Sequence, residues 1–129
     1  MVMQDQKTRL GQRFNAALLC RDPELSKVLN DPARVPEDLS FKASKVCIEN
    51  YNNKEIDGIV YVTQSPTNPL PTRACLLQDK LGITKNSLAF DINQGCSGFV
   101  YSLSLATSLI KNDLAERILI VCSDHYSKY

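Results

Sequence analysis

The chain has 129 residues, which is enough for one domain with a single buried core. Hydrophobic residues make up 43% of the sequence and charged residues 22%, and the net charge of +1 comes from interspersed acids and bases, so neither nucleic acid nor a membrane surface is expected as a partner. No apolar run approaches the roughly 20 residues that cross a bilayer, and the five cysteines and one histidine lack the spacing of a disulfide framework or a zinc site, so we expect a cytoplasmic protein without a metal.

Residues 1–35 are expected to form a separate helical segment whose role the sequence does not reveal. Apolar residues at Leu10, Phe14 and Leu18 fit one face of a helix, and Asp22 followed by proline fits the start of a second one. No β-strand is evident in this segment.

Residues 36–129 are expected to form the folded domain. Pro36 suits the first turn of a helix that ends between residues 49 and 52, with an apolar face made of Leu39, Ala43, Val46 and Cys47. The stretch from Gly58 to Thr63 follows as a short, nearly all-apolar strand, which is typical of a parallel sheet buried on both faces.

Residues 64–71 contain three prolines and are predicted to be a loop, with Pro71 starting the next helix. Gly82 is placed to end that helix in the left-handed conformation.

A strand over residues 88–93 then leads through Gly95, Cys96, Ser97 and Gly98 into an apolar helix that ends near Lys111 and Asn112, with a left-handed residue expected there. This helix is apolar nearly all round, which predicts that it is buried on all sides. Residues 117–123 are predicted to form a last buried strand. Strands and helices that alternate in this way predict an α/β layered fold.

Cys96 is the candidate nucleophile. A cysteine between glycines at a strand-to-helix turn is presented outward, and the unpaired N–H groups and dipole of a helix start favour a thiolate. We expect Cys96 to be alkylated at lower pH than Cys47 or Cys75. The alternative is that Cys96 only packs as a small hydrophobe, which is the interpretation given to Cys47, Cys75 and Cys122.

Three segments resemble one enzyme family in order and spacing. Asp91 followed by Cys96-Ser97-Gly98-Phe99 resembles the nucleophile segment of thiolase-fold condensing enzymes of the β-ketoacyl-acyl-carrier-protein synthase III group, and residues 56–83 and 117–124 resemble the same group. The resemblance implies the N-terminal half of a thiolase-like layered fold, with a mixed, mostly parallel sheet and helices on its faces.

The resemblance also implies a reaction. Cys96 would take an acyl group from coenzyme A, and a malonyl-carrier-protein substrate would then lose carbon dioxide and attack the thioester. Coenzyme A thioester is a substrate here, so no cofactor is expected. Thr72 and Arg73 would border the substrate, although a loop ordered by its prolines with a solvated Arg73 is the alternative. The Cys96 N–H is a candidate oxyanion donor, but a second donor is needed.

Condensation in this family also requires a histidine and an asparagine from the C-terminal half. His125 and Asn93 do not match those positions, so we expect the chain alone to be incomplete for catalysis. The competing interpretation is a non-catalytic half-domain that dimerises or binds carrier protein. The resemblance implies that the strand of residues 87–92 lies at a subunit interface, where its sheet edge would be paired, so both interpretations predict a homodimer. A redox thiol protein is a third interpretation, weakened by the lack of a resolving cysteine nearby.

Overall fold

The structure is a computed structural model that describes residues 2–3, 36–52 and 55–124. The helices predicted within residues 1–35 lie outside the described residues. The elements, in chain order, are β1 (Val2–Met3), α2 (Pro36–Asn50), β2 (Gly58–Val62), α3 (Arg73–Leu81), β3 (Leu88–Ile92), the 3₁₀ turn η2 (Gly95–Ser97), α4 (Gly98–Lys111) and β4 (Ile118–Cys122).

The centre of the fold is a four-stranded sheet in the order β1-β4-β2-β3. Strand β2 pairs in parallel with both neighbours, Gly58 lying opposite Leu88 on one side and Ile118 on the other. All five residues of β2 are buried. Such a strand has no polar face, which explains why its sequence is nearly all apolar.

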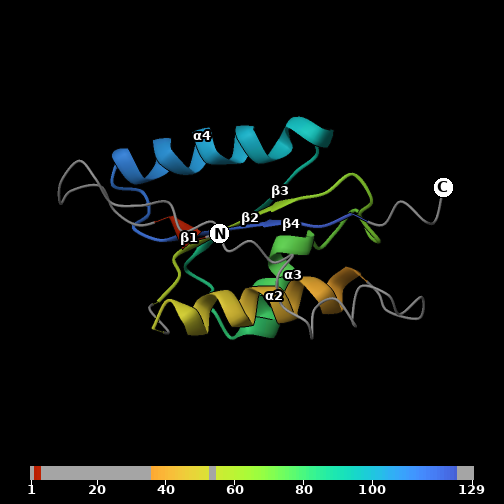
Figure 1. The fold of residues 1–129 in the computed structure, drawn as a ribbon, viewed down its shortest axis with the longest axis horizontal. Coiled ribbons are helices and arrows are strands. Elements are labelled where there is room, and N and C mark those ends of the chain that lie inside the picture. The colour runs from red at the N-terminus through yellow and green to blue at the C-terminus, as the bar shows by residue number, and fades with distance from the viewer. Residues whose placement is uncertain (1, 4–35, 53–54, 125–129) are drawn as a thin grey trace.

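Helices cover both faces of this sheet. In Figure 1 α4 lies on one side, and α2 and α3 lie together on the other. Alternate residues of β2 serve the two cores: Val60 and Val62 pack on the side of α4, whereas Ile59 and Tyr61 pack on the side of α2 and α3. The α/β layered fold with a mostly parallel sheet, predicted from the sequence, is confirmed.

A short N-terminal strand was not predicted. Val2 and Met3 pair antiparallel with Leu119 and Ile118 at the edge of β4. The expectation of no strand before residue 36 is therefore wrong. Two residues are too short to show the alternation by which a strand is recognised, and their strand structure depends on the partner strand.

Helix α2 covers the predicted residues, but its most buried positions are different. Ser40, Ser44 and Cys47 are buried, whereas Leu39 and Val46 are only half-buried. The Ser40 hydroxyl is hydrogen-bonded to the Tyr61 hydroxyl of β2 at 2.5 Å. A hydroxyl partner in the sheet makes a serine acceptable in this contact.

Helix α3 begins at Arg73, two residues after the predicted start at Pro71. Thr72 is its N-cap, and the Thr72 hydroxyl accepts a hydrogen bond from the Cys75 N–H at 3.4 Å. Gly82 ends the helix with φ of 67°, which confirms the predicted left-handed residue.

Helix α4 is buried on one side only, so the prediction that it is buried all round is wrong for the described residues. A stripe of Gly98, Ser102, Ala106 and Ile110 faces the sheet. The side chains of Phe99, Val100 and Tyr101 are 40%, 62% and 59% exposed. The sheet covers only one face of the helix; Leu103 and Leu109 beside this face are partly buried against the same core, and the side chains farther round are exposed.

The left-handed residue after α4 is Asp113, with φ of 57°, and not Asn112, whose φ is −96°. The Asn112 side chain instead donates to the Ser108 carbonyl oxygen at 2.8 Å. The predicted end of the helix is thus confirmed, but the left-handed conformation belongs to Asp113 and not to Asn112.

Gly98 sets the distance between α4 and the sheet. A Cβ at this position would overlap Cγ1 of Val62. We predict that Gly98→Ala lowers the free energy of unfolding by about 1–3 kcal/mol, because the added methyl group overpacks the contact. Urea unfolding followed by circular dichroism measures the change.

Val62→Ala is the matched variant for this prediction, since it removes the methyl group that Gly98→Ala would meet. The double variant should lose less stability than the sum of the two single variants. Strict additivity would contradict the packing explanation.

Candidate functional site

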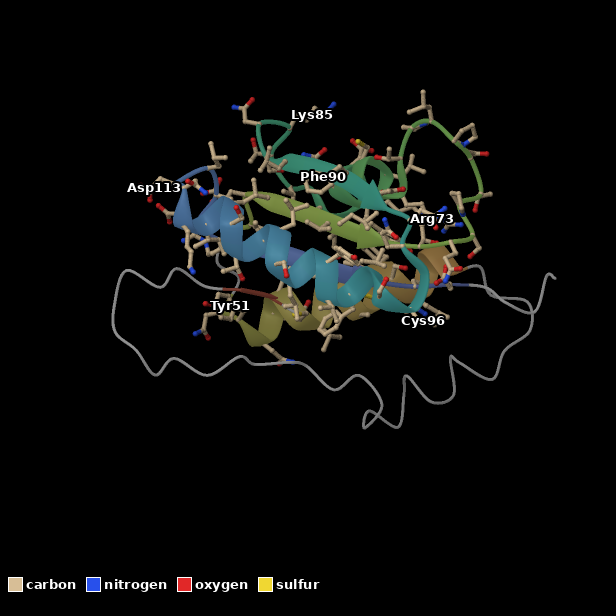
Figure 2. The ribbon with its side chains drawn as sticks, turned by 90° about the horizontal axis from the view of Figure 1, so that it is seen from above. Tyr51, Arg73, Lys85, Phe90, Cys96 and Asp113 are labelled. Atoms are coloured by element: carbon tan, nitrogen blue, oxygen red, sulfur yellow. The ribbon has the colours of Figure 1, made fainter. Side chains whose placement is uncertain are left out.

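Cys96 lies in the turn between β3 and α4. The side chain is exposed, and Gly95 before it adopts φ of 55°, a left-handed conformation that favours glycine. Figure 2 shows Cys96 at the start of α4, at the end of the sheet to which β2 and β3 point. The turn thus presents the thiol at the carboxyl edge of the parallel strands, as the sequence predicts.

The start of α4 is electrostatically suited to a negative group. Ser97 is the N-cap residue, but its side chain makes no capping hydrogen bond; its hydroxyl donates instead to the Gln94 carbonyl oxygen at 2.8 Å. The 14-residue helix places the positive end of its dipole at this turn. An oxyanion that develops beside this turn is favoured by this arrangement.

The loop that follows β2 is held by one carboxylate. Oδ1 of Asp124, two residues after β4, accepts hydrogen bonds from the Gln64 N–H at 2.6 Å, from the Ser65 N–H at 3.2 Å and from the Thr63 hydroxyl at 3.0 Å. Sequence reasoning gave Asp124 no role beyond the resemblance of its segment. Its partners are about 60 residues away in sequence, so no local pattern marks them.

A second carboxylate holds the start of α3. Oδ2 of Asp91 accepts from the Arg73 N–H at 2.9 Å, and Oδ1 accepts from the Ala74 N–H at 2.8 Å. A carboxylate from β3 therefore satisfies two of the free N–H groups at the helix start and interacts favourably with its dipole. Asp91 is part of the resembling motif, but its contact with α3 was not predicted.

Thr72 and Arg73 each have a structural role in the protein that does not require contact with a substrate. Thr72 caps α3, and Arg73 is 5% exposed, so the solvated Arg73 of the alternative interpretation is wrong. Arg73 Nη2 donates to the Ser65 carbonyl oxygen at 3.1 Å and to the Thr67 hydroxyl, which orders the loop.

The Arg73 side chain also lines a small cavity between α2 and α3. The cavity is lined by Ser40, Tyr61, Arg73, Leu76, Leu77 and Lys80. Tyr61 belongs to the core on the side of α2 and α3, which is the face of the sheet opposite α4. The structure therefore does not join the Arg73 side chain to the turn of Cys96, and substrate contact by Thr72 and Arg73 stays a prediction.

The other cysteines differ among themselves. Cys47 is buried and Cys75 is half-buried, with its thiol 3.8 Å from the Ala89 carbonyl oxygen, which confirms that both pack. Cys122 is exposed, so its interpretation as a packing residue is wrong. It is the last residue of β4, where four buried residues precede it and the strand emerges from the core.

His125 lies outside the described residues, and Asn93 is exposed directly after β3. Within residues 2–3, 36–52 and 55–124, no group of three or more histidine, cysteine, aspartate or glutamate side chains is arranged to bind a metal. The helices of the same residues include none with the length and apolar character needed to span a membrane.

Known proteins of one enzyme family are similar to this chain. The family described as 3-Oxoacyl-[acyl-carrier-protein (ACP)] synthase III matches residues 90–129. A protein of Clostridium perfringens strain SM101, named beta-ketoacyl-[acyl-carrier-protein] synthase III, is 44% identical over 93 residues, which are 70% of this chain and 28% of that protein. The chain is synthase III-like.

Solved structures show the same similarity. A crystal structure of a 3-oxoacyl-(acyl-carrier-protein) synthase III matches with a TM-score of 0.71 and 39% identity, covering 76% of this chain and 30% of the other. The enzyme of that name from Aquifex aeolicus VF5 matches with a TM-score of 0.69 and 33% identity, covering 74% and 32%. The synthase III-like chain thus has the N-terminal part of the thiolase-like fold and spans about 28% of the curated relative described above.

We predict that Cys122 needs a higher pH for alkylation in the folded chain than in the unfolded chain. Although Cys122 is solvent-accessible, neighbouring protein atoms partly desolvate its sulfur and raise the pKa of the thiol, and the negative charge of Asp124 adds to the rise. A raised pKa leaves less thiolate at a given pH. Iodoacetamide labelling across a pH series, mapped by mass spectrometry with and without urea, gives both midpoints, and equal midpoints would contradict this explanation by desolvation.

Proposed function

We propose that this chain is the nucleophile-bearing part of an acyltransferase of the 3-oxoacyl-acyl-carrier-protein synthase III type. The observation that carries the proposal is the exposed Cys96 in a glycine-flanked turn at the start of α4 in a synthase III-like fold. The relatives are named for acyl carrier protein, and acyl-coenzyme A with malonyl-carrier protein are the substrates that we propose for this chain.

Cys96 would act as the acyl acceptor. Its thiolate attacks the carbonyl carbon of an acyl-coenzyme A thioester, coenzyme A leaves as its thiolate, and an acyl-cysteine remains. The carbanion from a decarboxylating malonyl thioester then attacks that acyl group and releases Cys96. The uncapped start of α4 supports both steps, because negative charge develops beside it.

The condensation step would need groups beyond these residues. The N–H of Cys96 is one candidate oxyanion donor, and a second donor is required for a full oxyanion hole. A histidine and an asparagine that stabilise the enolate are expected from the resemblance, and Asn93 does not match that asparagine. We therefore propose that the 129-residue polypeptide is acylated at Cys96 but does not complete the condensation.

We predict that the polypeptide gains one acetyl group at Cys96 when mixed with acetyl-coenzyme A, and that it forms no 3-oxoacyl product when malonyl-carrier protein is added. Intact-mass and peptide mass spectrometry measure the first result, and chromatography of the carrier-bound products measures the second. Cys122→Ser should still be acetylated, whereas Cys96→Ser should not, because both cysteines are exposed but only Cys96 lies at a helix start. Acetylation that persists in Cys96→Ser, or condensation by the polypeptide alone, would overturn the proposal.

A non-catalytic domain that dimerises or binds carrier protein is the second candidate function. The specific observation in its favour is the edge of β3, which is the last strand in the sheet order and has half-buried residues along it. This function tolerates Cys96→Ser, whereas the acyltransferase does not. Dimerisation through β3 is proposed under both functions, and a cytoplasmic location stays a prediction.

We predict that Ala89→Pro converts a homodimer into a monomer. The Leu88 N–H donates to the Asp57 carbonyl oxygen on the side of β2, so the next N–H along the strand, at Ala89, points outward. Proline removes that outward donor without removing a bond to β2. Sedimentation velocity measures the assembly, with Ala89→Val as control; a monomeric unmodified chain or a dimeric Ala89→Pro would contradict the prediction.

A further inference from the structure

The two loops beside Cys96 leave the sheet in opposite directions. The chain after β2 runs to α3 on one face, and the chain after β3 runs through η2 to α4 on the other face (Figure 1). Neighbouring parallel strands whose connections separate in this way leave a crevice at their carboxyl ends, and ligands of open α/β sheets bind there. The turn of Cys96 follows β3 at this position, and residues 63–65 follow β2 beside it.

Gln64 is the residue of the β2 loop that reaches the turn. A Cβ placed on Gly95 would lie 3.2 Å from Gln64 Nε2 and 3.4 Å from Gln64 Cδ. Gly95 therefore lets the carboxamide approach its backbone more closely than other residues would. The same glycine adopts φ of 55°, so it serves both the turn and the contact with Gln64.

Asp124 fixes the backbone from which this side chain extends. Its Oδ1 accepts the Gln64 N–H at 2.6 Å and both the N–H and the hydroxyl of Ser65 at 3.2 Å. Charge-assisted hydrogen bonds of this kind are stronger than neutral ones. The carboxylate thus orders the loop from the side of β4, while Gln64 faces the turn after β3.

We propose that Gln64 is a positioning residue for Cys96, and that Asp124 acts through it. The uncharged carboxamide packs against Gly95 and supports the turn that presents the thiol, without adding a negative charge where a thiolate must form. The inference rests on the proposed function of Cys96 as nucleophile. It adds a role for two residues that lie outside the nucleophile segment.

The test is to place a charge at this contact. Gln64→Glu is nearly isosteric, but it puts a carboxylate against the turn, where it disfavours a neighbouring thiolate. The pH midpoint of Cys96 alkylation by iodoacetamide in the full 129-residue chain should rise by about half a pH unit or more at low salt. Asn68→Glu is the matched control, since it adds the same charge at an exposed position of the same loop, and it should leave the midpoint unchanged.

A second pair of variants tests the role of Asp124. Asp124→Ala removes the anchor, so the shift caused by Gln64→Glu should shrink in that background. Asp124→Asn keeps an acceptor oxygen and should preserve most of the shift. Circular dichroism and slow labelling of buried Cys47 verify that each variant is folded.

The outcomes separate this inference from the proposed function. A midpoint in Gln64→Glu equal to that in the unmodified chain and in Asn68→Glu would overturn the positioning role, even if Cys96 is acetylated. A raised midpoint together with failure of acetylation would support the positioning role and reject the acyltransferase. A shift in Asn68→Glu as large as that in Gln64→Glu would show a general effect of net charge and also overturn the proposal.

Discussion

The parallel pairing of β2 with both of its neighbours is the constraint on which the rest of this structure depends. Parallel neighbours require crossover connections, and here α3 crosses from β2 outward to β3 while α4 returns across β2 to β4. Crossovers of one hand that travel in opposite directions place their helices on opposite faces. Both faces of β2 are therefore covered, and the three carboxyl ends, with Cys96 beside them, meet at one edge.

Carboxylates at the ends of the sheet join segments that are distant in sequence. Asp91 fixes the start of α3, and Asp124 fixes the loop after β2. Asp57, just before β2, accepts the Glu116 and Arg117 N–H groups at 2.7 Å each and holds the approach to β4. Each carboxylate satisfies backbone donors that no helix or ladder can use, so loop geometry is set by a few strong interactions and not by loop sequence.

The sequence predicts those features whose physical cause lies within a few neighbouring residues. The apolar run of β2, Gly82 at the end of α3 and the glycines around Cys96 each have a backbone or burial reason that is visible in a few neighbouring residues. The failures are of another kind. Cys122 is exposed because the end of β4 extends beyond the residues that bury the rest of the strand. Val2 and Met3 form a strand only because they pair with β4. The roles of Asp91 and Gln64 depend on contacts with residues that are distant in sequence.

The stripe of small residues on α4 also determines how the nucleophile is supported. Gly98, Ser102 and Ala106 let the helix lie almost directly on the sheet, and the Ser102 hydroxyl is satisfied within the helix, by the Gly98 carbonyl oxygen at 2.6 Å. The helix therefore packs closely against β2 and β4, and Cys96 lies just before its first residue. A side chain at Gly98 would meet Val62, so the place of the helix start that follows Cys96 depends on a side-chain volume in the neighbouring strand β2.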